Sequence, residues 1–381
     1  MRKESFSSTV HGFRAPLAII TVAILAGCFG GVKKPQPYEL QPVTALMSAR
    51  QSWISRIGVV NFPLDLVVSG NSVSVASDDG TVALLDTQTG RDIWRIELKT
   101  PIAAGVGSDG KVLAVVTKSN EVVALQSGRE LWRQKLTSQV FTAPFVAGER
   151  VFVLAADRSI SAFDGQTGRK LWSQQRPNEP LVLRQSGVML AVDDTLVAGF
   201  GGRLAGLDPS TGNLKWEAPI ATPRGINDVE RLVDLVGGAS RVGSSVCARA
   251  FQASIGCVNA TRGSVVWTKP ANGVQGIRGD DRLLFGTEAD GTVTAWKRAD
   301  GERAWSSDRL RYRGLSTPLV AGRSVAIGDA TGFVHLLSRE DGSLLNRLTT
   351  DGSPISSAPV LAGNTLIAVT RNGGIFGFQP E

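Results

Sequence analysis

The chain has 381 residues, a formal net charge of +7, 42% hydrophobic and 20% charged residues, and 43 glycines beside 14 Phe, 8 Trp and 2 Tyr. This length indicates either two domains or one large repetitive architecture, and the composition excludes a largely disordered chain. Lysines and arginines are scattered singly and form no basic strip interleaved with aromatic residues, so nucleic-acid binding is not expected.

Residues 1–27 are typical of a secretory signal. They begin with Arg2 and Lys3, continue with the apolar run 16–25, and end in the small pair Ala26-Gly27 before Cys28. The apolar run has about half of the ~20 residues that a membrane-spanning helix needs, so a permanent transmembrane anchor is the weaker interpretation. Loss of residues 1–27 would lower the net charge to +5, because three basic residues and one acidic residue leave.

The segment Leu25-Ala26-Gly27-Cys28 resembles a bacterial lipobox, which implies that the Cys28 thiol carries a lipid. Phe29 follows, and not the Asp that usually retains lipoproteins in the inner membrane. The resemblance therefore implies an anchor on the periplasmic face of the outer membrane. The alternative is a soluble periplasmic protein whose ordinary signal is removed together with Cys28. Residues 28–50 are rich in Pro and Gly, and we expect them to be a tether.

One pattern recurs from residue 73 onward: two short alternating strands, a turn, and a Gly followed four residues later by Trp. The Gly and Trp positions of successive copies are Gly90 and Trp94, Gly128 and Trp132, Gly168 and Trp172, Gly212 and Trp216, Gly263 and Trp267, Gly301 and Trp305, and Gly342 and Asn346, where Asn stands in the Trp position. Intervals of 38, 40, 44, 51, 38 and 41 residues separate these positions, which is the period of one four-stranded propeller blade per repeat.

The strands of each copy alternate apolar and polar residues, and no segment shows sustained helical spacing, so the predicted fold is all-β. In the turn Asp-x-x-Thr-Gly, the Asp side chain can accept hydrogen bonds from backbone amides while Gly takes a left-handed conformation. Seven copies leave residues 365–381 as an incomplete eighth blade. We predict that the strand-like segment 52–57, with Trp53, completes it and closes an eight-bladed β-propeller over residues 51–381.

Cys247 and Cys257 are the only cysteines besides Cys28. A hairpin turn centred near Gln252 would place them opposite each other on paired strands. We predict a disulfide that reinforces this hairpin locally, since the periplasm is oxidising.

The repeat Asp-x-x-Thr-Gly-x-x-x-Trp resembles that of the pyrroloquinoline-quinone (PQQ) type propellers. With its length and lipobox, the mature chain is similar to the lipoprotein propellers of the outer-membrane β-barrel assembly (BAM) machinery. This resemblance implies a non-catalytic scaffold without a cofactor. Its partners would be the periplasmic (POTRA) domains of the barrel subunit BamA and, by strand addition at blade edges, unfolded outer-membrane proteins.

Two segments between blades carry the expected contact with BamA. The resemblance assigns an anchor to Leu181, Leu183 and Arg184, and an electrostatic second patch to Glu230, Arg231 and Asp234. Loops on a rigid ring are suited to such contacts. Val236 departs from the family pattern, where a second acidic residue is expected. The alternative interpretation is that the two leucines are ordinary inward strand residues and Arg184 is a solvated turn charge.

Two alternative functions belong to other classes. One is an enzyme, a shortened quinoprotein dehydrogenase with PQQ and calcium. The other is a propeller that binds a small ligand or glycan without catalysis. His335 is the only histidine after residue 27 and lies in an apolar strand, which is more often a packed position than a catalytic one. Asp86, Asp164 and Asp208 could suggest calcium, but their fixed place before Thr-Gly favours turn chemistry. Catalysis and a metal site are therefore not expected.

Overall fold

The computed structural model describes residue 7, residues 35–176 and residues 181–381. Cys28 and, apart from Ser7, the predicted signal sequence lie outside these residues. The chain divides into the units Met1–Gln36 and Pro37–Glu381, and the second contains all of the strands. The described residues form eight four-stranded antiparallel sheets, which confirms the predicted all-β fold. No helix among them is long and apolar enough to cross a membrane.

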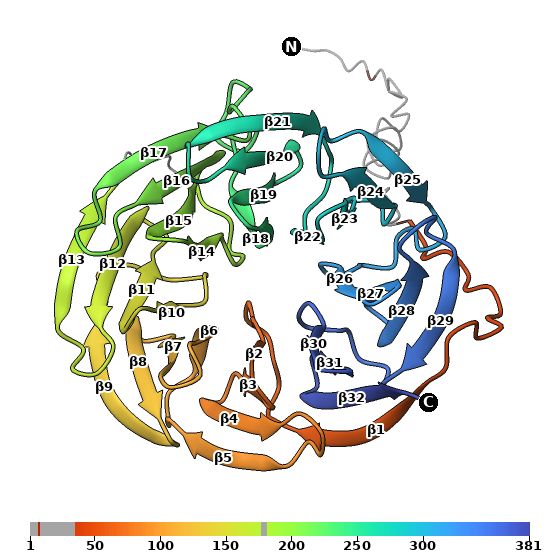
Figure 1. Ribbon diagram of the computed structural model, residues 1–381, viewed down its shortest axis with the longest axis horizontal. Coiled ribbons are helices and arrows are strands. Elements are labelled where there is room, and N and C mark those ends of the chain that lie inside the picture. Colours follow the sequence, from red (N-terminus) through yellow and green to blue (C-terminus); the bar gives the residue numbers. More distant parts are fainter. Residues whose placement is uncertain (1–6, 8–34, 177–180) are drawn as a thin grey trace, which may run out of the picture. The chain divides into compact units, whose positions relative to one another are not determined.

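The sheets are arranged as blades around a ring (Figure 1), and the chain runs from the innermost to the outermost strand of each blade. The strands of blades 1 to 4 are β2 (Val67–Ser69), β3 (Ser72–Ala76), β4 (Thr81–Asp86) and β5 (Asp92–Glu97); β6 (Ile102–Ser108), β7 (Leu113–Thr117), β8 (Glu121–Gln126) and β9 (Arg129–Lys135); β10 (Phe145–Ala147), β11 (Arg150–Leu154), β12 (Ser159–Asp164) and β13 (Lys170–Gln175); and β14 (Met189–Val192), β15 (Thr195–Phe200), β16 (Arg203–Leu207) and β17 (Leu214–Pro219).

Blades 5 to 7 repeat this arrangement, and blade 8 combines the two ends of the described chain. Their strands are β18 (Leu235–Val242), β19 (Ser245–Ala250), β20 (Ser254–Asn259) and β21 (Ser264–Pro270); β22 (Ile277–Gly279), β23 (Leu283–Thr287), β24 (Val293–Lys297) and β25 (Arg303–Ser307); β26 (Leu319–Ala321), β27 (Ser324–Gly328), β28 (Phe333–Ser338) and β29 (Leu344–Thr349); and β30 (Val360–Ala362), β31 (Thr365–Val369), β32 (Gly374–Pro380) and β1 (Ala49–Arg56).

The ring is closed by pairing of β1 with β32, as predicted from the unfinished last repeat. The two strands are antiparallel, with Trp53 opposite Gly377 and Arg56 opposite Gly374. In Figure 1 the first strand lies outside the last one, so segments more than 300 residues apart share one blade. This pairing covers the edge that β32 would otherwise expose.

Each repeat Trp packs on the repeat Gly of the following blade. A Cβ atom built on that Gly would approach the Trp side chain to 2.3–3.2 Å at seven junctions, which are Gly90 on Trp53, Gly128 on Trp94, Gly168 on Trp132, Gly212 on Trp172, Gly263 on Trp216, Gly301 on Trp267 and Gly342 on Trp305. In blades 2 and 3, the Trp132 indole also donates to the carbonyl of Gly165 over 2.9 Å. The Trp side chain therefore fills the contact between neighbouring blades.

The repeat Asp organises the same turn. Asp164 Oδ1 accepts hydrogen bonds from the amides of Gln166 and Thr167 and from the Thr167 hydroxyl, at 2.8–3.1 Å. These bonds lower the pKa of Asp164, and equivalent bonds led by the Ser210 hydroxyl lower the pKa of Asp208 to about 2. The repeated carboxylates thus serve the turns, as the turn interpretation predicted.

Gly168→Ala is expected to destabilise the protein more than Gly243→Ala. Both glycines have positive φ, 71° and 56°, so each substitution costs about 1–2 kcal/mol of backbone strain. Only at Gly168 does the new methyl group meet an indole, at 2.5 Å, whereas nothing lies within 4 Å of the Gly243 position. Such overpacking adds about 1–3 kcal/mol. Urea unfolding of both variants measures the difference, and equal losses of stability would contradict the role assigned to the Trp–Gly contact.

The junction between blades 7 and 8 differs, because Asn346 replaces the Trp and the chain enters the ring there. The Asn346 side-chain amide donates to the carbonyl of Met47 over 2.7 Å, just before β1. β1 begins at Ala49, two residues before the predicted start of the propeller, and residues 38–48 already lie against blade 7. This junction therefore uses a small amide side chain to hold the incoming chain.

Candidate functional site

The structure brings the two predicted contact segments together. Leu181–Arg184 lies in the connection from blade 3 to blade 4, and residues 230–234 lie in the connection from blade 4 to blade 5. The amide of Leu183 donates to Asp234 Oδ2 over 2.9 Å, which joins positions 51 residues apart. Both connections run from an outer strand to the next inner strand, so they belong to one face of the ring.

A buried ion pair fixes this arrangement. Arg158, in the turn between β11 and β12, lies 2.5 Å from Asp234 Oδ1, and the two residues are only 8% and 7% exposed. Arg158 also donates to the carbonyl of Leu181 over 3.2 Å. Asp234 is therefore a positioning residue inside the protein, and its carboxylate is not presented to solvent as the predicted electrostatic patch required. Sequence reasoning missed Arg158, because its partners become neighbours only in the ring.

Apolar side chains are exposed on both of these connections. Leu181 is 40% exposed, and the predicted patch is preceded by Ile226 and Val229, which are 99% and 71% exposed. Arg184 is exposed and its guanidinium lies 5.4 Å from the centre of the Phe141 ring. We call Leu181, Leu183, Arg184, Ile226 and Val229 the apolar–Arg surface. The sequence signal for Ile226 and Val229 was the presence of apolar residues in a Gly- and Asp-containing stretch without strand alternation.

The loop that carries Ile226 and Val229 is stabilised from within. Glu230 Oε2 accepts the amide of Ile226 over 2.8 Å, and Asn227 Oδ1 accepts the amide of Glu230 over 2.9 Å. Arg231 is exposed beside it. A groove of about 680 Å³ separates this loop from the edge of blade 5. Val236 stands where the family pattern has an acidic residue. Its side chain is buried in β18, so this difference from the family pattern does not alter the surface.

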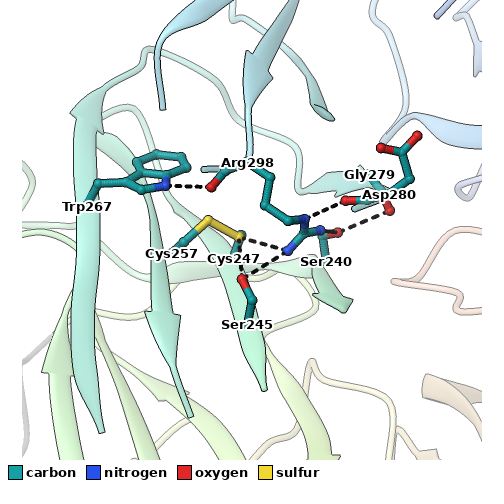
Figure 2. The surroundings of a disulfide bond; sticks show 8 residues. All are labelled: Ser240, Ser245, Cys247, Cys257, Trp267, Gly279, Asp280 and Arg298. Carbon is teal, nitrogen blue, oxygen red and sulfur yellow. Dashed lines mark hydrogen bonds between the residues drawn. A yellow bond between two sulfur atoms is a disulfide. The ribbon is translucent and has the colours of Figure 1, made fainter. Parts of the chain in front are cut away.

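The two cysteines follow the predicted hairpin. Gln252 has a φ of 48° in the turn, Cys247 pairs with Cys257 across β19 and β20, and their sulfurs are bonded (Figure 2). Arg298 reaches from blade 6 and donates to Cys247 Sγ over 3.1 Å and also to Ser240 Oγ. The bridge therefore joins two strands of one hairpin in blade 5, and Arg298 of blade 6 packs against it.

The central channel is another concave region of the ring. It has a volume of about 730 Å³ and mostly apolar walls, with Asp65, Arg241 and Arg278 as its charged residues. Ser186 donates to Asp65 over 3.0 Å, and Arg278 donates to the carbonyl of Ala239 over 3.0 Å. Arg241 donates to the carbonyl of Ala191. Each of these charged side chains already bonds neighbouring strands or loops.

His335 belongs to a buried structural network. Its Nε2 lies 2.9 Å from Asp329 Oδ2, to which Arg313 Nε donates over 2.8 Å. Burial lowers the pKa of His335 against the opposing attraction of Asp329, and nearby Arg347 and Arg313 lower it further. Burial opposes ionisation of Asp329, but hydrogen bonds from His335, Phe333 and Arg313 prevail and lower its pKa. The packed position predicted for the lone strand histidine is confirmed.

We expect the free energy of unfolding to decrease in two pH windows as the pH is lowered. Below the ordinary His pKa of 6.5, unfolded His335 takes up a proton that the folded protein resists, so the neutral form's contribution is lost. Below the ordinary Asp pKa of 3.8, the unfolded carboxyl protonates before folded Asp329, and a second loss follows. Urea midpoints measured between about pH 7.5 and about pH 5 should decrease in the wild type and change less in His335→Asn. Identical profiles would contradict the assignment.

Within the described residues, the repeated carboxylates do not form a calcium site of the quinoprotein kind. The described part of the chain contains no group of three or more His, Cys, Asp or Glu side chains placed to hold a metal ion. The carboxylates of Asp86, Asp164 and Asp208 are occupied by turn amides and hydroxyls.

Eight four-stranded blades, with a Trp packed on the repeat Gly at seven of the junctions, define a β-propeller of the PQQ-repeat class. A family model described as "Outer membrane protein assembly factor BamB" matches residues 78–307. The chain therefore belongs to the BamB family.

Relatives of the same description cover nearly the whole chain. The protein from Burkholderia pseudomallei is 36% identical over 97% of this chain and 98% of its own length, and that from Bordetella pertussis is 34% identical over 96% of each. The crystal structure of BamB from Moraxella catarrhalis superimposes with a TM-score of 0.80 at 25% identity, and covers 87% of this chain and 99% of that one. Family and architecture thus agree.

Proposed function

We propose that this protein is a non-catalytic lipoprotein scaffold of the BAM complex, which binds the periplasmic POTRA domains of BamA and aids insertion of barrel proteins. The observation that carries the proposal is the apolar–Arg surface, whose two segments are joined by the Arg158–Asp234 ion pair. The relatives of this chain are named outer membrane protein assembly factors. These names support membership of the BAM complex and a periplasmic location associated with the outer membrane.

The chemistry of this surface suits protein recognition. Leu181, Ile226 and Val229 expose apolar area, and Arg184 supplies a cation held against the Phe141 ring. Interfaces gain most of their energy from a few apolar, aromatic and Arg side chains. Because the ion pair and the Leu183–Asp234 hydrogen bond fix the backbone before binding, less conformational entropy is lost on association.

Cys28 is the proposed lipidation site, and the lipid would hold the ring at the periplasmic face of the outer membrane. Mass spectrometry of the N-terminal peptide of protein purified from membranes tests this assignment. A mature chain that starts after Cys28, or an unmodified Cys28, would overturn it.

A matched pair of double variants tests the partner surface. Leu183→Ala/Arg184→Ala removes two residues of the apolar–Arg surface, and Leu131→Ala/Arg129→Ala removes an equivalent exposed pair from β9. Affinity capture from solubilised envelopes is expected to retain BamA with the wild type and the β9 variant. Retention by the first variant should fall by about tenfold or more, since hot-spot side chains each contribute about 2 kcal/mol. Equal capture by both folded variants would contradict the assigned surface.

A further inference from the structure

Residues 38–48 lie along blade 7 before they enter β1, and we call them the strap. The amide of Tyr38 donates to the carbonyl of Arg311 over 3.1 Å, and Arg313 donates to the carbonyl of Tyr38 over 3.0 Å. Rings support this contact, since Tyr38 meets Tyr312 edge-on at 6.1 Å and the Arg311 guanidinium lies 5.9 Å from the centre of the Tyr38 ring. One end of the strap is thus fixed to the connection between blades 6 and 7.

The rest of the strap is bonded to blade 7 along its length. Arg347 donates to the carbonyl of Gln41, and Arg323 donates to the carbonyl of Leu46. The amide of Leu46 donates to the carbonyl of Leu345 over 2.9 Å. Leu40 and Met47 pack against the apolar cores of blades 6 to 8. With the bond from Asn346 to Met47, these contacts hold a segment that composition alone predicts as a free tether.

The position of Tyr38 limits how the ring can lie at a membrane. Tyr38 is the tenth residue after Cys28, so a fully extended chain reaches about 35 Å between them. If residues 28–48 were all free, the reach to the start of β1 would be about twice as large. Tyr38 and Leu46 are 42% and 63% exposed, so the strap presents an aromatic and an aliphatic side chain outward.

We propose that the strap fixes the exit of the lipid-anchored chain at the rim of blades 6 and 7, so that this rim lies against the lipid surface. The apolar–Arg surface lies on the same kind of inter-blade connection, two to three blades earlier around the ring. The inference rests on the proposed lipidation of Cys28, and it adds an orientation that lipidation alone does not give.

Site-specific quenching tests the orientation. A fluorophore is attached to Arg309→Cys, beside the strap exit, or to Gln166→Cys, in the turn of blade 3, both exposed positions. The full lipidated protein is placed on phosphatidylethanolamine/phosphatidylglycerol vesicles that carry nitroxide headgroups. The label at position 309 is expected to lose most of its fluorescence, and the label at position 166 to keep most of it.

Two variants separate the strap from the fold. Twenty Gly/Ser residues inserted between Gln36 and Pro37 leave the strap intact but lengthen the tether by up to about 70 Å. Tyr38→Ala/Leu40→Ala/Asn346→Ala loosens the strap itself. Both are expected to make quenching at positions 309 and 166 similar while circular dichroism stays unchanged. Equal quenching in the lipidated wild type would overturn the orientation alone, whereas absence of lipid on Cys28 would overturn the anchor and the inference with it.

Discussion

Asp234→Ala is expected to lower the free energy of unfolding by about 3–5 kcal/mol, since it leaves Arg158 buried without its counterion. It should also abolish capture of BamA, although Asp234 is only 7% exposed. The physical reason is that one carboxylate holds both segments of the apolar–Arg surface, through Arg158 and through the amide of Leu183. Chemical denaturation and affinity capture measure the two losses.

A second variant separates stability from positioning. Arg158→Met/Asp234→Leu removes both charges, and replacement of a buried pair by apolar residues is often neutral for stability. The amide of Leu183 still loses its acceptor, so we expect near-normal unfolding together with weak capture. If this double variant captured BamA as well as the wild type, the ion pair would be a stabilising feature with no part in presenting the surface.

Trp53→Ala is expected to cost about 3–5 kcal/mol and to weaken closure of the ring. The side chain is 8% exposed, its indole donates to the carbonyl of Thr87 over 3.0 Å, and its ring packs on Gly90 and Gly377. It therefore joins blade 8 to blade 1 at Gly90 and packs β1 on β32 at Gly377. Urea unfolding measures the loss, and proteolysis of β1 should become faster.

Ile54→Ala provides the matched control for ring closure. Ile54 is the next residue of β1 and is 52% exposed, so its truncation should change stability by no more than about 0.5 kcal/mol. Both variants keep the backbone pairing of β1 with β32. If the two substitutions lowered stability equally, closure would depend on the backbone pairing of β1 with β32 and not on the packing of the Trp53 side chain.

The strap gives residues 38–48 a role that composition did not predict in full. Pro and Gly in this stretch indicated a tether, yet the contacts of residues 38–48 are with Arg311, Arg313, Arg323 and Asn346, all more than 270 positions away. No local pattern reports such contacts. Asn346 was visible as an exception to the repeat, and its reason appeared only with Met47 beside it.

The sequence by itself determined the repeat, its turns and the closure of the ring. Closure of the ring followed from the unfinished last repeat. The repeat and its turns depend on short-range spacing, since Asp164 lies within three residues of the amides that donate to it and Gly and Trp recur at a blade's length. The hairpin pairing of Cys247 and Cys257 was predictable for the same reason. Only the tertiary structure decided that Arg158 meets Asp234 and that the strap meets blade 7. These contacts join different blades, so their partners are set by how the ring closes in space and leave no periodic signal along the chain.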